Sequence, residues 1–361
     1  MTLVGVHGNA SGLLTPADLD VLIVSRAEAV KLLSTGLASD VSRVRAINPA
    51  MLVIVRLHMA WWTMSVPRVI SPSRYADWLV PDVRKFYDVG IRYFEFPNEP
   101  NLYLEGYGAN WIGATFAAWW IAVRDKLKGR FPDAKWGYAG LSPGPVIPGT
   151  RGERERDFAL ASQEAVESAD WLGVHCYWTD RTQMLHPDFG NGWRWYLKTF
   201  PGKPVYITEY SNPDSAVSSD EKGLQYRAWL SQVQGPIATF GFISSGETWV
   251  HESWAGTNIP AIVGSREQDE ELMTPLSDIL AKLKNDTPIA VVKTLATLLT
   301  VRDGFGVSLG TIPTGTVKLV YKKNMSFPWQ FGDNRALIVP DGTVPAENIW
   351  MGSAGETLDF V

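Results

Sequence analysis

Two glutamates, Glu99 and Glu209, each come at the end of a short apolar segment of the kind that forms β-strands. The first lies in Phe94–Pro100 and the second in Pro204–Tyr210. Two carboxyl groups suit cleavage of a glycosidic bond, in which a carboxylic acid protonates the departing oxygen and a carboxylate acts as nucleophile or as base for water. We therefore predict a two-carboxylate active site at the C-terminal ends of two strands.

The neighbours of these glutamates suggest how the roles divide. Asn98 directly precedes Glu99, and its amide can bind a sugar hydroxyl, although a cap or turn at a strand end would explain the same tripeptide. A nucleophilic Glu209 must stay ionised, whereas Glu99 must keep its proton until it is donated. Arg56 and Tyr177 are the candidates for stabilising Glu209. A structural ion pair at the barrel mouth remains the alternative for Arg56.

Two further acids compete with the chosen pair. Glu95 alternates with Phe94 and Phe96, so it points the opposite way from them, either into the interior of a barrel or toward a structural partner. Glu247 lies near another predicted strand end. We prefer Glu209 because an acid after the fourth strand and a nucleophile after the seventh account for the residues beside them.

Three of the five histidines, His7, His58 and His175, fall at or near predicted strand ends. Three histidines at strand tips can ligate zinc or manganese. No predicted strand carries a His-x-His pair, however, and a metal site would leave the two glutamates unexplained. We predict no metal and no other cofactor, with His58 and His175 contacting the sugar or orienting the carboxylates as neutral imidazoles.

The chain has 16 tryptophans, more than packing requires, and the flat indole face stacks well on a sugar ring. Trp61, Trp178 and Trp249 follow predicted strands, where barrel loops meet substrate. Further tryptophans expected in the walls are Trp193, Trp195 and Trp254. Two that are expected to be packing residues are Trp119 and Trp120.

The first 285 residues alternate short β-type runs with longer segments suited to helices, which predicts parallel strands joined by crossover helices. Eight strands are predicted at Leu3–His7, Ala29–Leu33, Leu52–His58, Tyr93–Phe96, Lys135–Gly140, Trp171–Tyr177, Val205–Thr208 and Thr239–Ser244. The predicted fold is an α/β protein, a (β/α)8 TIM barrel over residues 1–285 whose eighth helix is Glu267–Leu283. Residues 286–361, rich in glycine between valine and leucine runs, predict a small β-rich extension or domain.

Composition narrows the possible partners. The net charge is −5 with no lysine or arginine run, so we predict no nucleic-acid partner. No segment reaches the roughly 18 apolar residues of a membrane span, and the N-terminus lacks the pattern of a signal peptide, so the protein is either cytoplasmic or secreted with its signal removed. The single Cys176 is expected to be a buried thiol. Composition does not specify the oligomeric state.

The motifs quoted above resemble those of the retaining glycoside hydrolases of clan A, which include cellulase-like, β-mannanase-like and β-xylosidase-like barrels. The resemblance covers about residues 1–285 and does not select a family within the clan. It implies that Glu99 is the acid/base with Asn98 beside it, and that Glu209 is the nucleophile. It also implies that His175 or Tyr177 is the contact from the sixth strand, that Trp249 is the aromatic platform after the eighth, and that Arg56 is the arginine near the nucleophile.

The leading hypothesis is a retaining hydrolase that cleaves a β-linked oligosaccharide or polysaccharide. A non-catalytic carbohydrate-binding or cell-surface barrel is the second, although a pure binding protein has no need of two facing acids. A metal-dependent barrel hydrolase is the third. The sugar, the linkage and endo or exo action depend on loop shape, which the sequence does not reveal.

Overall fold

The computed structural model describes residues 2–58, 70–105 and 111–266, together with four short strands between residues 293 and 350. Contacts divide the chain into two compact units, Met1–Arg266 and Glu267–Val361. Each unit is described by itself.

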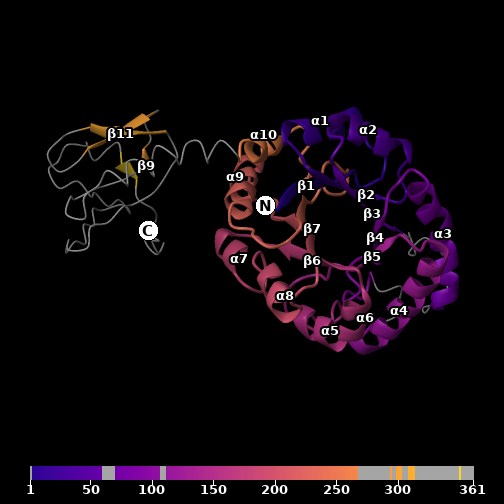
Figure 1. Cartoon of the computed structure of the whole chain (residues 1–361). Helices are drawn as coiled ribbons and strands as arrows, with labels where there is room; N and C mark the ends of the chain where they lie inside the picture. The colour runs from indigo at the N-terminus through magenta and orange to yellow at the C-terminus, as the bar shows by residue number, and fades with distance from the viewer. Residues whose placement is uncertain are drawn as a thin grey trace. The chain divides into compact units, whose positions relative to one another are not determined.

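The first unit is a closed barrel of eight parallel strands that pair in chain order, with β8 returning to β1 (Figure 1). The strands are β1 Leu3–His7, β2 Ala29–Leu33, β3 Leu52–Arg56, β4 Tyr93–Phe96, β5 Lys135–Tyr138, β6 Trp171–Tyr177, β7 Val205–Ser211 and β8 Ala238–Gly241. The predicted barrel is confirmed, and all eight strands lie where the apolar runs indicated. β7 is longer than predicted and includes Glu209, whereas β3, β5 and β8 end earlier.

Helices form a ring around the barrel (Figure 1). They are α1 Pro16–Val24, α2 Ser39–Ile47, α3 Pro72–Tyr87, α4 Gly113–Arg130, α5 Glu155–Ala161, α6 Gln163–Ser168, α7 Arg181–Leu185, α8 Trp193–Thr199, α9 Ser219–Leu230 and α10 Ile259–Gly264. Local sequence fixes several starts. Thr15 and Asp18 form a reciprocal capping box before α1, and Ser71 caps α3 with Pro72 at its first position.

Apolar side chains gather in two places. The larger core lies between the barrel and its helices, and includes Trp120, Tyr210 and Trp229. A smaller cluster fills the barrel interior toward the N-terminal ends of the strands, and consists of Ala29, Ile54, Trp171, Tyr206, Ala238 and Phe240. Filling of a barrel interior by layers of side chains from successive strands is the general pattern of this fold.

A β-bulge interrupts the pairing of β6 with β7. The register passes from Val174 opposite Ile207 to His175 opposite Glu209, so Thr208 is an extra residue on β7. The same irregularity occurs where β7 pairs with β8. Tyr206 and Glu209 therefore both face the barrel interior, although strict alternation over three positions would put them on opposite faces.

The second unit contains two pairs of antiparallel strands, β10 Leu298–Arg302 with β11 Ser308–Pro313, and β12 Ile349–Trp350 with β9 Lys293–Thr294. The β-rich extension predicted for residues 286–361 stays a prediction. The predicted helix Glu267–Leu283 and the predicted boundary between residues 285 and 286 lie outside the described residues.

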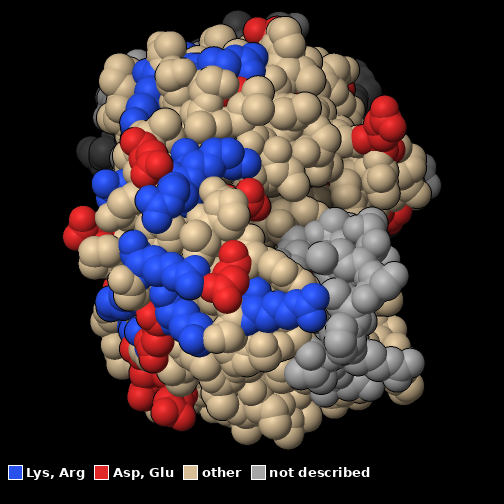
Figure 2. Space-filling view, turned by 90° about the vertical axis from the view of Figure 1, so that its right-hand side faces the viewer, with Lys and Arg blue, Asp and Glu red and all other residues tan. Residues whose placement is uncertain are grey.

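Among the described residues, no helix has the length and apolar character needed to cross a membrane. On the face of the molecule in Figure 2, acidic and basic side chains are intermixed with uncharged ones.

Candidate active site

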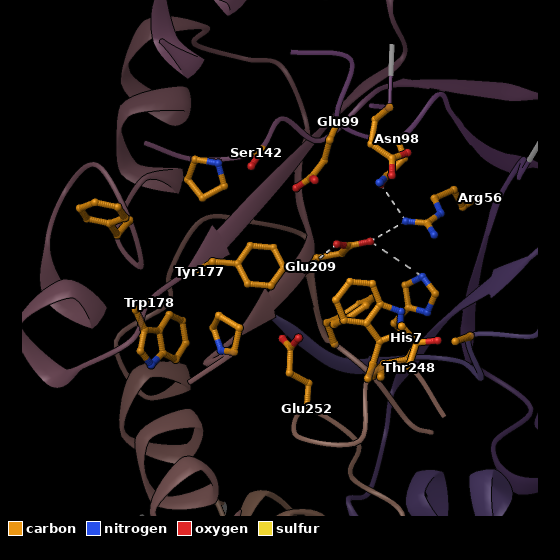
Figure 3. A pocket seen from close by; sticks show the side chains of 18 of the residues that line it. His7, Arg56, Asn98, Glu99, Ser142, Tyr177, Trp178, Glu209, Thr248 and Glu252 are labelled. Atoms are coloured by element: carbon orange, nitrogen blue, oxygen red, sulfur yellow. Dashed lines mark hydrogen bonds and ion pairs between the residues drawn. The ribbon is translucent and has the colours of Figure 1, made fainter. Parts of the chain in front are cut away.

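A cavity of about 660 Å³ opens at the C-terminal ends of the barrel strands (Figure 3). Strands from around the whole barrel contribute to it. The lining residues from the strand ends and the loops after them include His7, Arg56, His58, Asn98, Glu99, Tyr177, Trp178, Glu209, Phe242, Trp249 and Glu252. The two sequence-predicted glutamates thus share one cavity.

Glu209 is 3% exposed and is surrounded by donors. Its Oε1 accepts hydrogen bonds from Arg56 at 2.8 Å and from Lys31 at 3.0 Å, and its Oε2 accepts one from the Tyr177 hydroxyl at 2.6 Å. Burial opposes ionisation of Glu209, but His175, Lys31 and Arg56 outweigh it and hold the pKa well below its ordinary value. Glu209 is therefore a carboxylate across the physiological pH range.

Lys31 is a site residue that the sequence analysis missed. It lies on β2 with 0% exposure, and its Nζ is 3.0 Å from Glu209 Oε1 and 3.2 Å from Glu95 Oε2. Glu95 points into the barrel, the first of the two orientations that its alternation on β4 allowed. The alternation of β2 places Lys31 on the same face as Ala29, and this was the available signal.

Glu99 lies beyond β4 and is joined to the strand-six histidine. The Nδ1 of His175 is 2.8 Å from Glu99 Oε1 and 3.5 Å from Glu209 Oε2. Burial lowers the pKa of His175, but the two carboxylates raise it by more, so the net shift is upward. The upward shift favours the protonated form of His175, whereas the sequence analysis expected a neutral imidazole.

The backbone around this pair is specialised. Glu99 has φ of 34°, in the left-handed region that non-glycine residues rarely adopt, and its N–H donates to Gly140 O at 3.1 Å. A Cβ added at Gly140 would lie 2.2 Å from the His175 ring, so only glycine leaves room for that ring. The backbone of Gly140 thus binds the Glu99 N–H and leaves room for the His175 ring.

One oxygen of Glu99, one oxygen of Glu209 and a His175 nitrogen all lie within 4.8 Å of one another. The two carboxyl groups differ in their surroundings, because Lys31 and Arg56 both contact Glu209 whereas Glu99 contacts the His175 ring. Two facing carboxyl groups in different environments can act as an acid and a nucleophile.

The other two predicted histidines line the cavity. His7 Nδ1 donates to Gly8 O at 2.9 Å, which leaves Nε2 as the acceptor, 3.9 Å from Glu209 Oε1. Burial and then Lys31 and Arg56 lower the pKa of His7 well below 6.5. Burial and Arg56 likewise lower the pKa of His58 to about 4. Both rings are therefore neutral at physiological pH.

Arg56 links the two strand ends that carry the glutamates. Its NH1 donates to Asn98 Oδ1 at 2.7 Å as well as to Glu209. The amide oxygen of Asn98 is thus turned toward Arg56, which leaves its NH₂ group for other partners. Glu105, also on the cavity wall, has its pKa raised by burial, against the lowering influence of Arg56.

The predicted tryptophans divide into wall and core. Trp249 is 45% exposed on the cavity rim, with its ring edge-on to Phe242 at 5.4 Å. Trp178 lines the cavity but is buried, stacks on Tyr210 and donates from Nε1 to Gln225 at 2.9 Å. Trp61 lies outside the described residues.

Three further wall residues were predicted from the sequence. That expectation was wrong for Trp193 and Trp254, which are buried in the core between barrel and helices, and Trp195 packs partly buried against the same core. Trp119 and Trp120 are packing residues as predicted.

The loop after β8 supplies residues that the sequence analysis did not single out. Phe242 lies at the strand end beside His7 and Tyr177, and Glu252 lies farther along the same loop. Glu247, which the sequence analysis ranked as the rival acid, is exposed and does not line the cavity. Glu252 was missed because it comes well after the apolar run of the strand.

Glu99, His175 and Glu209 have the spacing of a three-ligand metal site. The chemistry of the donors argues against a cation there. Lys31 and Arg56 both lie within 3.0 Å of Glu209 Oε1, and His175 Nδ1 is already bonded to Glu99. Two fixed positive charges on the same carboxylate oxygen repel a divalent ion.

The fold resembles solved structures of glycoside hydrolases. A GH128 (subgroup II) endo-β-1,3-glucanase from Sorangium cellulosum aligns with a TM-score of 0.52 and 17% identity, over 73% of this chain and 98% of that chain. A glucosidase from Croceicoccus marinus aligns with a TM-score of 0.53 and 14% identity, over 74% and 67% of the two chains. A calcium-binding mutant of Bacteroides uniformis β-glucuronidase 2 aligns with a TM-score of 0.53 and 10% identity, over 87% of this chain and 41% of that chain.

No protein-family model matches the chain, and no curated protein matches it in sequence. Identities of 10% to 17% show a shared fold. The predicted resemblance to glycoside hydrolase barrels is therefore confirmed for the fold, and the family within them is not resolved.

Proposed function

We propose that this protein is a retaining glycoside hydrolase that cleaves a β-linked oligosaccharide or polysaccharide. The observation that carries the proposal is the approach of Glu99 and Glu209 to within 4.8 Å at one cavity. Carboxyl groups about 5 Å apart leave no room for a water beneath the sugar, which favours direct attack by one of them, whereas inverting enzymes hold them about 6.5–9.5 Å apart.

In the first step, a Glu209 oxygen attacks the anomeric carbon and the bond to the glycosidic oxygen breaks. The departing oxygen takes the electron pair of that bond and a proton from Glu99. In the second step, Glu99, now a carboxylate, removes a proton from water, and the water oxygen displaces Glu209 from the anomeric carbon. The products are a free sugar with retained configuration and the starting enzyme.

The contacts around each glutamate support these roles. Lys31, Arg56 and Tyr177 stabilise the Glu209 carboxylate before attack and when it departs. The 2.8 Å contact with His175 Nδ1 holds the Glu99 carboxyl group in place and offsets its negative charge after it has given its proton to the leaving oxygen. The exposed Trp249 offers a stacking surface to a sugar at the rim.

Hydrolysis of a panel of oligosaccharides tests the proposal, using β-1,3-glucan, β-1,4-glucan, mannan, xylan and galactan chains. β-1,3-Glucan comes first because a structurally similar protein is described as an endo-β-1,3-glucanase. We expect cleavage of one class, with loss of nearly all activity in Glu209→Ala and Glu99→Ala. Proton NMR of the first product should show the anomer of the substrate, and the opposite anomer would overturn the retaining mechanism.

Two controls complete the experiment. Glu247→Ala removes an exposed acid near the cavity and should leave activity unchanged. Activity that survives treatment with a chelator is expected, because no step uses a metal. Binding of a saccharide by all variants without any cleavage would replace the proposal with a carbohydrate-binding barrel.

A further inference from the structure

Glu252 is a third carboxyl group in the cavity, and the two-step reaction does not use it. It lies in the loop after β8, is 4% exposed and lines the cavity with the two glutamates. Figure 3 shows its carboxyl group turned up toward Tyr177 and Glu209. Its Oε2 has no hydrogen-bond partner within the protein. A buried polar atom without a partner is costly and calls for a ligand or another explanation.

The loop fixes the position of this side chain. The N–H of Glu252 donates to Trp249 O at 2.9 Å, and its carbonyl accepts from Ile243 N–H at 3.2 Å. Beneath the loop, Lys222 Nζ donates to the carbonyl oxygen of His251 at 2.7 Å. Hydrogen bonds thus fix the backbone at Glu252 and at the residue before it, and the carboxyl group faces the cavity.

Burial favours the protonated form of this acid below about pH 7. Burial raises the pKa of Glu252 to about 7, against the lowering influence of the Ser211 hydroxyl and the Lys222 ammonium. The titratable and charged groups that face it from the surrounding elements are Lys222 and Tyr226 on α9, Tyr177 on β6, Glu209 on β7 and Glu99 after β4. A neutral carboxyl group in a carbohydrate cavity has one donor and one acceptor, which matches a sugar hydroxyl.

We propose that Glu252 binds a hydroxyl group of the glycone, the sugar that becomes attached to Glu209, and so selects a neutral sugar that carries a hydroxyl there. In Figure 3, Glu252 lies on the other side of Glu209 from Glu99. Because Glu99 protonates the leaving oxygen, a group on the opposite side meets the sugar that is retained. This inference rests on the proposed function and assigns one substrate contact of the same site.

Saccharide binding tests the inference separately from cleavage. Calorimetry with the same oligosaccharide panel compares Glu99→Gln, which blocks chemistry, with Glu99→Gln/Glu252→Ala and Glu99→Gln/Glu252→Gln. We expect alanine to weaken binding by roughly 10- to 100-fold at pH 6, and glutamine, which keeps a donor and an acceptor, to restore most of it. Glu247→Gln in the same background is the matched control from the same loop region.

The pH dependence of binding tests the protonated form. Affinity of the Glu99→Gln protein should fall as the pH rises through about 7, because Glu252 then loses its donor, and Glu252→Gln should remove this fall. Equal binding by the Glu252→Ala protein would overturn the inference while cleavage by the wild type still supports the hydrolase. Failure of every saccharide to bind the wild type would overturn both.

Discussion

Two levels of the same barrel interior are built from opposite kinds of side chain. Toward the N-terminal ends of the strands, Ile54, Trp171 and Phe240 fill the interior with apolar groups. Toward the C-terminal ends, Lys31 and Glu209 form an ion pair that is almost wholly removed from water. β2 contributes to both levels, with Ala29 in the lower and Lys31 in the upper.

The difference shows how the fold separates stability from chemistry. Burial of the lower level removes apolar surface from water and so stabilises the barrel. Burial of ions in the upper level costs desolvation free energy, which their mutual attraction offsets only while every partner is present. The upper level is therefore the part of the interior in which function, rather than stability, explains the residues.

The largest effect is expected from Lys31→Met, which leaves Glu95 and Glu209 buried without the cation between them. Removal of one member of a buried ionic cluster should lower the free energy of unfolding by about 3–5 kcal/mol. It should also lower kcat/KM by about 10²-fold, because the carboxylate loses a preorganised donor. Chemical denaturation and steady-state kinetics measure the two effects.

The double variant Lys31→Met/Glu95→Leu is the matched control for this prediction. It removes the lysine together with Glu95, which pairs with no other cation among the described residues. Much of the lost stability should therefore return while activity stays low. Recovery of activity together with stability would contradict the separation of the two levels.

Ile54→Ala tests the lower level. Ile54 is fully buried in the apolar cluster, and its truncation should lower the free energy of unfolding by about 2–5 kcal/mol through lost burial and a residual cavity. The kcat/KM of the folded enzyme should remain near the wild-type value, measured well below the melting temperature. A large loss of kcat/KM would mean that the apolar level also positions the reacting groups.

Glu155→Gln tests how a buried acid outside the barrel interior affects stability, for comparison with the ionic level inside it. Glu155 on α5 accepts a hydrogen bond from Tyr196 at 2.7 Å, and burial raises its pKa to about 7. The folded protein keeps this proton to about pH 7, whereas the unfolded chain releases it near 4.5. Its contribution to stability is thus present below pH 4.5 and is lost as the pH rises to 7, by about 3 kcal/mol.

Denaturation at pH 4.5, 6 and 7.5 measures this dependence. The glutamine variant should lose less stability with rising pH than the wild type does, although Glu252 leaves a similar dependence in both proteins. Asp157→Asn, an exposed acid on the same helix, is the control and should follow the wild type. Identical pH profiles for Glu155→Gln and wild type would contradict the raised pKa.

The smallest effect is expected at the rim, above both levels. Trp249→Ala removes an exposed ring that contacts Phe242, so stability should change little. Loss of a stacking surface should raise KM about fivefold, or about 1 kcal/mol, with kcat nearly unchanged. Val250→Ala is the exposed control beside it, and an unchanged KM for the longest substrate cleaved would contradict a stacking role.

The barrel was predictable from the sequence because short apolar runs alternate with longer segments suited to helices. The same feature located Glu99 and Glu209, and the structure brings both to one cavity. Lys31 was not predicted, because the residues next to it in an apolar strand do not indicate which acid it pairs with. That partner, Glu209, is 178 positions away along the chain.

Loop residues were the less predictable part of the site. Glu252 reaches the cavity only through the path of the loop after β8, which no strand pattern specifies. Trp193 and Trp254 were expected in the walls, but an indole suits a buried core as well as it suits a sugar face. Local sequence does not distinguish these two uses of the same side chain.

The bulge at Thr208 has a consequence for comparisons of this protein with distant relatives. Over the paired segment β7 carries one more residue than β6. From Glu209 onward, residues of β7 are therefore shifted by one position relative to their partners on β6. An ungapped alignment to a barrel without this extra residue would set the glutamate one place out of register. His175 on β6 is the residue paired with Glu209. An alignment that keeps this pair together places the glutamate correctly, so the pair identifies Glu209 more reliably than the sequence of β7 alone.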